Sequence, residues 1–347
     1  MRATSKLVLS CCKAKLYLGE TCRCQSINIV KRTMVNYIFK LRSLSPVKIG
    51  KETISYISIN SWVASEKRNN DSNNKQREAI IDGIINNKIP NEYFIKSNRW
   101  RSLKNAVDLF VSEVFPEMKD GESVECKQKG GRGYNYDFDF ILNQEKTHIE
   151  LKFNAANVDE TPQFASPMKP SQYLSQSFEE YHYTHVLPEI TKLCQHLSIP
   201  DKERYMKEIH GNQPACMIDY QKLYYEGCKG SSKFTEDPIA IRFYQESREK
   251  AKKGIHDFIE ETNLNNEKLS EYLLESQKGK IYMLFQNGKF HLQEVNLDDY
   301  KIEAVEKNPT KSRYECRTKT GITMNVLLRW KNGNGIAFPA FQISAQR

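Results

Sequence analysis

Hydrophobic and polar residues alternate in two neighbouring runs near the middle of the chain, at residues 134–142 and 147–153. Both runs are rich in β-branched and aromatic residues, and four polar residues, Asn143 to Lys146, separate them. This pattern predicts two antiparallel strands joined by a short loop. Because successive side chains of a strand point to opposite faces, the hairpin has one apolar face and one face that carries carboxylates and an amine.

A loop centred on Gln144-Glu145 places Asp139 opposite Glu150, and Asp137 opposite Lys152. Directly opposed residues have Cβ atoms about 4.5–5.5 Å apart. Two carboxylates at this separation repel each other unless a cation lies between them, and all-oxygen ligands suit Mg²⁺ or Mn²⁺. Lys152 lies close enough to reach a water or a phosphate on such an ion. The alternative interpretation is a solvated cross-strand ion-pair face, which is common on antiparallel sheets.

Periodicity predicts further elements on both sides of this hairpin. Residues 102–115 have a helical apolar stripe with Ser102 as the expected N-cap, and a short strand is expected at 123–127. Residues 66–76 are expected to form a polar linker or loop. The remaining predicted elements are strands within 35–62, helices at 75–87, 242–261 and 267–277, a helix capped by Ser171, and hairpins at 281–295 (around Asn287-Gly288) and 322–343.

These elements predict an α/β fold in which helices flank a mixed β-sheet. The expected organisation is a basic N-terminal extension (1–33), a segment of unknown role (34–99), a core with the central hairpin (100–199), a helical insertion (200–279), and C-terminal β-hairpins that complete or extend the core (280–347).

The formal net charge of +9 comes entirely from the first 50 residues, which hold ten Lys or Arg and one acidic residue, Glu20. The rest of the chain carries 42 basic and 42 acidic residues. Net charge therefore gives no argument that the body of the protein binds nucleic acid, and only local clusters can. No apolar run approaches the ~20 residues of a membrane helix, so no membrane association is expected.

The first 33 residues are basic, contain Ser and Cys, and precede Met34. They fit a transit peptide, an extension read from an earlier start codon, or an arm that contacts DNA. We favour a dispensable extension, with organellar targeting second. The nine cysteines are scattered without a regular framework, which predicts free thiols in a reducing compartment such as the cytoplasm.

The hairpin residues Asp139 and Glu150-Leu151-Lys152 resemble the active site of the PD-(D/E)xK superfamily nucleases. The predicted order of helix, short strand and hairpin also resembles the beginning of these enzymes, in which a helix packs on the apolar side of a mixed sheet. The resemblance implies that Asp139, Glu150 and the Leu151 carbonyl bind Mg²⁺, with Mn²⁺ as a substitute, and that Lys152 positions or deprotonates the attacking water. The usual Pro before the Asp is absent, so the choice between Asp137 and Asp139 stays open.

Within this superfamily the chain resembles type II restriction endonucleases, and its Asn-, Lys- and Ile-rich body resembles those of large algal DNA viruses. The resemblance implies a site-specific endodeoxyribonuclease that acts on double-stranded DNA, forms a homodimer and is paired with a DNA methyltransferase. Two alternatives stay open: a repair, recombination or mobile-element nuclease of the same superfamily, and a DNA-binding protein without activity. Glu113 is a secondary candidate for the site, and the candidate DNA contacts are Arg132, Lys169, Gln172, Arg329, Lys331 and Asn332.

Overall fold

The computed structural model describes residues 44–63, 70–129, 134–158, 165–194, 196–211, 213–331, 333 and 335–345. Contacts divide the chain into two compact units, residues 1–107 and 108–347. Helices occur together with mixed and antiparallel sheets, so the fold is of the expected α/β class. The basic extension 1–33 lies outside the described residues. Within the described ranges, no helix combines the length and apolarity needed to cross a membrane.

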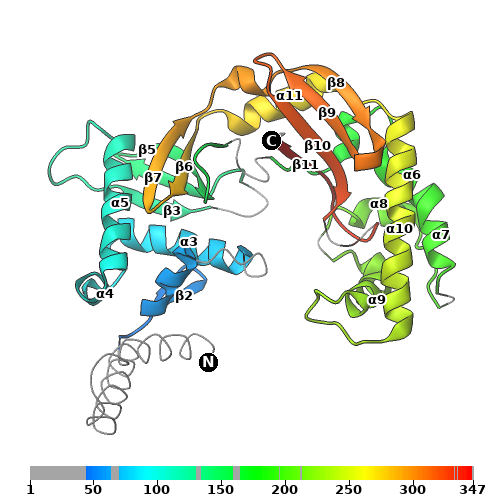
Figure 1. The fold of residues 1–347 in the computed structure, drawn as a ribbon, viewed down its shortest axis with the longest axis horizontal. Coiled ribbons are helices and arrows are strands. Elements are labelled where there is room, and N and C mark those ends of the chain that lie inside the picture. The colour runs from blue at the N-terminus through cyan, green and yellow to red at the C-terminus, as the bar shows by residue number, and fades with distance from the viewer. Residues whose placement is uncertain are drawn as a thin grey trace, which may run out of the picture. The chain divides into compact units, whose positions relative to one another are not determined.

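The first unit contains a two-stranded antiparallel sheet followed by helices (Figure 1). Trp100 is fully buried and donates its indole N–H to the Tyr56 carbonyl at 2.8 Å, which ties the start of α5 to the preceding segment. The elements are β1 (Val47–Ile49), β2 (Glu52–Ile54), the 3₁₀ helix η1 (Tyr56–Trp62), α3 (Asn70–Ile85), α4 (Asn91–Lys96) and α5 (Asn98–Val114), which continues into the second unit.

Three boundary predictions in this region are wrong. The alternating run within 35–62 ends as a strand at Ile54, since Ser55 and Ser58 form a capping box that starts η1. Residues 70–76, expected as linker, are helical. There the buried Arg77 donates to the Ser61 carbonyl at 2.8 Å and holds the polar helix in place. α5 begins at Asn98, where the Ser97 hydroxyl accepts from the Trp100 N–H, so Ser102 is not its N-cap.

The second unit contains a five-stranded mixed sheet in the order β3-β4-β5-β6-β7. β5 and β6 are parallel and the other neighbours are antiparallel. The predicted apolar face is confirmed: Phe110 of α5 packs its ring edge-on against Phe140 and also contacts Phe290. The strands are β3 (Glu125–Gln128), β4 (Phe138–Leu142), β5 (Glu145–Phe153), β6 (Lys280–Gln286) and β7 (Lys289–Glu294).

The predicted hairpin around Asn287-Gly288 is confirmed as β6 and β7, with positive φ at both turn residues. This hairpin completes the mixed sheet. The second C-terminal hairpin instead belongs to a separate four-stranded antiparallel sheet in the order β11-β10-β9-β8. The strands of this sheet are β8 (Ile302–Asn308), β9 (Arg313–Thr318), β10 (Thr323–Trp330) and β11 (Pro339–Ala345), with the 3₁₀ helices η7 (Leu297–Tyr300) and η8 (Pro309–Lys311) alongside.

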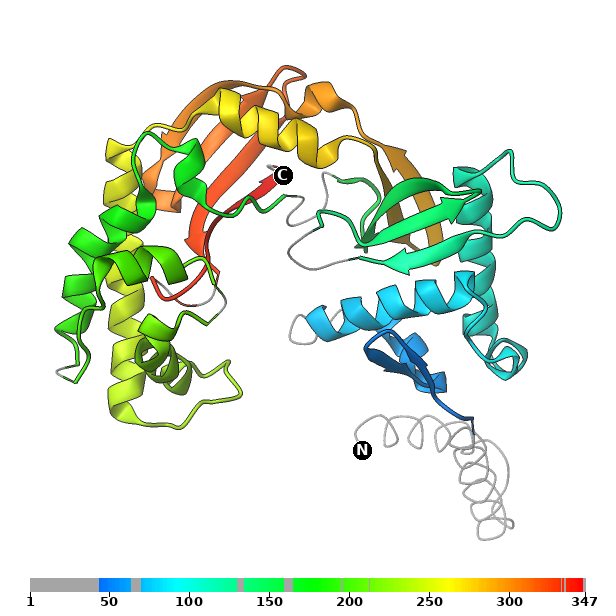
Figure 2. The same cartoon turned by 180° about the vertical axis from the view of Figure 1, so that it is seen from behind.

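Helices from the middle of the chain cover one face of this four-stranded sheet, as the view from behind in Figure 2 shows. Phe178 packs on Trp330, and the Tyr314 hydroxyl donates to the Thr262 carbonyl at 3.1 Å. The expected long helices of the insertion are confirmed as α10 and α11. The helices are η4 (Pro170–Tyr173), α6 (Phe178–Tyr181), the π-helical turn η5 (His182–Val186), α7 (Leu187–Thr191), α8 (Lys202–Glu208), η6 (Ala215–Met217), α9 (Ile218–Gly227), α10 (Pro238–Glu261) and α11 (Asn266–Gln277).

Candidate active site

The turn of the central hairpin determines which polar residues meet. Asn143 and Gln144 both have positive φ, 50° and 73°, which is the backbone of a two-residue type I′ turn. Leu142 therefore pairs with Glu145, and Asp139 pairs with His148. The prediction that Asp139 lies opposite Glu150 is wrong, because the turn is centred one residue earlier than expected. The pairing is shifted by two residues in consequence.

Asp137 takes the place next to Glu150. Its backbone N–H donates to the Ile149 carbonyl at 2.9 Å, and its Oδ2 accepts from the Leu151 N–H at 2.9 Å. These two partners flank Glu150 on either side along β5. The question left open between Asp137 and Asp139 thus has a geometric answer: Asp137 is the aspartate beside Glu150.

Two lysines face the Glu150 carboxylate. The Nζ of Lys152 lies 2.5 Å from Oε1, and the Nζ of Lys280 lies 4.0 Å from Oε2. The exposed fractions of the side chains are 13% for Glu150, 18% for Lys152 and 3% for Lys280. These charged groups are therefore largely removed from water, in contrast to the solvated ion-pair face that was the alternative interpretation of the hairpin.

Burial lowers the pKa of both lysines and the nearby carboxylates raise it, and the balance differs between Lys152 and Lys280. Burial tends to lower the pKa of Lys152, but the charge and hydrogen bond of Glu150, together with the charge of Asp137, outweigh it and raise this pKa. At Lys280 burial prevails and lowers the pKa, although Glu150 and Asp137 oppose the change. The same four residues therefore act on one another electrostatically.

Lys280 was not predicted from the sequence. It is the first residue of β6 and pairs with His148 in the parallel register, which places it on the polar face of the sheet. More than a hundred residues separate β5 from β6, so no local pattern reports this neighbour. In the sequence, Lys280 follows Gly279 at the start of a β-rich segment. This pair of residues does not indicate a functional site.

Asp139 belongs to a different group. Its Oδ1 lies 2.9 Å from Nδ1 of His148, and its Oδ2 lies 3.3 Å from Nζ of Lys129. Tyr136 stacks on the His148 ring with the centroids 4.1 Å apart. Burial tends to raise the pKa of Asp139, but the hydrogen bonds from His148 and Lys129 outweigh it and leave the pKa below its ordinary value. The Asp139 carboxylate is therefore already paired, and its predicted place beside Glu150 is occupied by Asp137.

The donor set fits a hard divalent cation. Asp137 and Glu150 offer carboxylate oxygens and Leu151 offers a backbone carbonyl, which are the ligand types that Mg²⁺ and Mn²⁺ prefer. In the part of the chain that the structure describes, no three His, Cys, Asp or Glu side chains gather so as to hold a metal. Two carboxylates are still sufficient for Mg²⁺, which typically keeps several waters and completes its shell with substrate phosphates.

The remaining predicted residues do not join this group. Glu113 is exposed on α5, the helix that packs on the apolar side of the sheet. Lys169 acts electrostatically on Glu179 and His210, in the helical region, and Gln172 lies in η4 of the same region. The expected position of Lys169 and Gln172 at the metal edge thus has no support. Arg132 and Asn332 lie outside the described residues.

Arg329 and Lys331, two of the predicted DNA-contacting residues, lie at the end of β10. Arg329 is in the strand, and Lys331 directly follows it. The Arg329 guanidinium donates to Oε1 of Gln342 on β11 at 2.6 Å. Burial, followed by the charge of Arg329, lowers the pKa of Lys331. The two cations therefore lie near each other at the end of β10.

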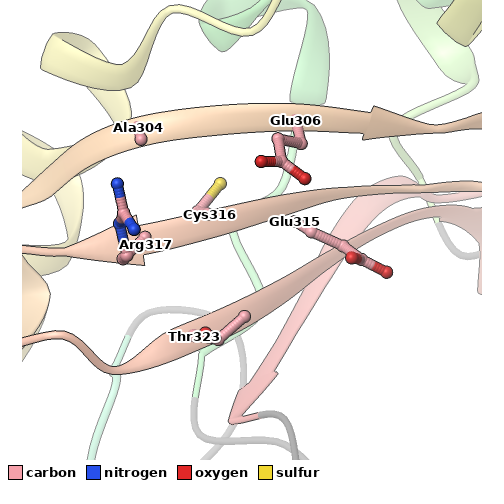
Figure 3. Close-up of a pocket in the computed structure, with 6 residues that line it drawn as sticks. All are labelled: Ala304, Glu306, Glu315, Cys316, Arg317 and Thr323. Atoms are coloured by element: carbon pink, nitrogen blue, oxygen red, sulfur yellow. The ribbon is translucent and has the colours of Figure 1, made fainter.

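A separate hollow lies on the open face of the four-stranded sheet, and Figure 3 shows Glu306 and Glu315 on its neighbouring strands. Glu315 already accepts hydrogen bonds from Arg313 and Asn308. These contacts are exchanged within the sheet, so this hollow is less suited to chemistry than the Glu150 group. The residues that line it are Ala304, Glu306, Glu315, Cys316, Arg317 and Thr323.

Comparisons with protein family models, with curated proteins and with solved structures give no match to this chain.

Proposed function

We propose that the protein is a Mg²⁺-dependent endodeoxyribonuclease that resembles PD-(D/E)xK enzymes of the type II restriction class. One observation carries this proposal: Asp137, Glu150 and Lys152 are gathered at the polar face of a mixed sheet, where all three are at least half-buried. The helix α5 packed on the opposite, apolar face matches the arrangement that the resemblance implies.

The burial of these charges favours a functional role. Removing a carboxylate or an ammonium from water costs several kcal/mol, and ion pairs repay this cost only with good geometry. Apolar residues of similar volume would stabilise the sheet at least as well. This cost in free energy is greatest for Lys280, because only 3% of its side chain is exposed. Groups whose burial perturbs their pKa in this way are concentrated at functional sites.

In the proposed mechanism Asp137 and Glu150, with the Leu151 carbonyl, would hold Mg²⁺ or Mn²⁺. When bound, such an ion stabilises negative charge on a phosphate and lowers the pKa of coordinated water. Lys152 lies against Glu150 but is not a ligand, and its ammonium can donate to the attacking water or to a phosphate oxygen. The Leu151 N–H keeps the Asp137 carboxylate directed at the group through its bond to Oδ2.

Duplex DNA is the proposed substrate, and local contacts must supply the affinity because residues 51–347 carry no net charge. Arg329 and Lys331 are the described candidates for contacts to phosphates or base edges. A homodimer, a partner DNA methyltransferase and a cytoplasmic location stay predictions that accompany the restriction-enzyme class. The five described cysteines are free thiols, which fits a reducing compartment.

A panel of DNA substrates tests the proposal and separates it from its alternatives. Purified protein with Mg²⁺ is incubated with supercoiled plasmid, linear plasmid and a branched oligonucleotide, and a parallel series contains EDTA. We expect discrete fragments from both plasmids, and none with EDTA. A smear, or cutting confined to the branched substrate, would indicate a repair or recombination nuclease. Binding without cutting of any substrate would indicate a DNA-binding protein.

A further inference from the structure

Each oxygen of the Glu150 carboxylate faces its own ammonium group. Lys152 lies at Oε1 and Lys280 at Oε2, at 2.5 and 4.0 Å. The two lysines come from different strands, β5 and β6, so they approach the carboxylate from separate directions. A motif of Asp, Glu and Lys accounts for Lys152 alone. The second, more deeply buried lysine has no role in it.

The charges of this group cancel. Two carboxylates, Asp137 and Glu150, stand against two ammonium groups, Lys152 and Lys280. The neighbouring Asp139 is paired with Lys129 and adds no net charge. A divalent cation that binds to Glu150 must therefore displace an ammonium group from the carboxylate. The displaced ammonium then still lies close to the bound cation. Repulsion between an ammonium and a divalent cation at a few ångströms is substantial even at the dielectric constant of water.

A phosphate group changes this balance. Its oxygens accept hydrogen bonds from ammonium groups as carboxylate oxygens do, so the lysines can exchange Glu150 for the phosphate. The carboxylate oxygens then become available to a cation, and the added negative charge favours that cation further. Neither step requires any change of protonation.

We propose that Lys280 is a positioning residue that serves as a built-in counter-cation of Glu150. It holds the carboxylate in place, weakens the binding of divalent cations by the protein alone, and yields to the cation when a DNA phosphate arrives. This inference rests on the proposed function, because it takes Glu150 as a metal ligand. It deepens that function by making cation uptake depend on the substrate.

The test measures cation binding directly, without DNA and without activity. Mn²⁺ is titrated into wild-type protein and into Lys280→Met, and free Mn²⁺ is followed by electron paramagnetic resonance. Methionine has similar volume and no charge. We expect Lys280→Met to bind Mn²⁺ at least about tenfold more tightly than wild type, because one repelling charge is removed. Lys280→Arg keeps the charge and should bind as weakly as wild type.

Lys127→Met is the matched control. Lys127 lies on β3 of the same sheet, is paired with Glu125 at 3.1 Å and is exposed, so its loss should leave Mn²⁺ affinity unchanged. Thermal unfolding of each variant confirms that it is folded. If Lys280→Met does not fold, Lys280→Gln replaces it, because it also removes the ammonium and the same gain is expected.

The outcomes separate this inference from the proposed function. Equal Mn²⁺ affinity in wild type and in the variant that lacks the Lys280 ammonium overturns the counter-cation role and leaves the nuclease proposal in place. A gain in Lys127→Met as large as that in Lys280→Met also overturns it, since the effect is then one of net charge alone. No Mn²⁺ binding by wild type or by any of these variants contradicts the metal site itself and with it the proposed function.

Discussion

Asp137, and not Asp139 as expected from the sequence, lies beside Glu150, and this difference gives the most specific prediction. Asp137→Asn should lose most of the cleavage activity, whereas Asp139→Asn should keep most of it. Both substitutions preserve side-chain shape and remove one negative charge. They differ in location: Asp137 lies beside Glu150, while Asp139 is bound by His148 and Lys129.

The expected magnitudes follow from these contacts. Asn at position 137 can still accept from the Leu151 N–H, so the local backbone should be retained while one of two anionic ligands is lost. Loss of a group that stabilises transition-state charge typically lowers kcat by about 10²–10³-fold. Asn at position 139 removes a charged hydrogen-bond partner, which should cost about 1.5–3 kcal/mol of folding free energy. It leaves Asp137, Glu150 and Lys152 in place, so the rate should fall much less than in Asp137→Asn.

Initial rates of plasmid cleavage at saturating Mg²⁺ measure the first effect, and urea unfolding of the same samples measures the second. We expect Asp137→Asn to be the less active variant and Asp139→Asn to be the less stable one. Inactive Asp139→Asn together with active Asp137→Asn would refute the register argument. Equal loss of activity in both would mean that the two carboxylates act as one unit.

Three further predictions concern the frame of the site. Phe110→Ala should destabilise the second unit by about 3–5 kcal/mol in urea unfolding, because Phe110 is 1% exposed between Phe140 and Phe290. A cost below about 1 kcal/mol would contradict this packing. Gly335→Ala should lower the melting temperature, because Gly335 has φ +77° and an added Cβ would lie 1.8 Å from Nε2 of the buried His182, whereas Gly230→Ala meets open space and should change little. The pKa of Asp139 is depressed in the fold, so its contribution to stability is present above the unfolded value of about 3.9 and is lost as pH falls through the folded pKa. The stability difference between wild type and Asp139→Asn should therefore shrink in acid unfolding, and a difference that grows would contradict the pairing.

The elements of the site could be predicted from the sequence because they are local. Alternation over the central hairpin identified both strands and both faces, and Asn287-Gly288 identified the turn between β6 and β7. The register could not be obtained in this way. A slip of one residue exchanges the two faces of a strand, but a slip of two residues leaves both faces unchanged. The hydrophobic pattern therefore does not determine whether Asp137 or Asp139 lies beside Glu150.

Other features depend on contacts between distant residues. Lys280 reaches Glu150 only because β6 pairs in parallel with β5, and the intervening helices carry no information about this pairing. The polar start of α3 was expected as a linker, but the buried Arg77 and its bond to the Ser61 carbonyl stabilise it as a helix. In both cases tertiary contacts, rather than local preference, determine the outcome.

The most direct test of the central claim is cleavage and binding of duplex DNA by Lys152→Ala. Lys152 lies against Glu150 and has no metal-ligand role in the proposed mechanism, so its removal costs DNA binding at most one phosphate contact but should slow the chemical step by on the order of 10²-fold or more. Fluorescence anisotropy with a labelled duplex measures binding, and single-turnover cleavage with Mg²⁺ measures the chemical step. We predict that Lys152→Ala still binds the duplex and cuts far more slowly. Cutting at the wild-type rate, or no Mg²⁺-dependent cutting by wild type, would contradict the assignment of Asp137, Glu150 and Lys152 as a nuclease centre.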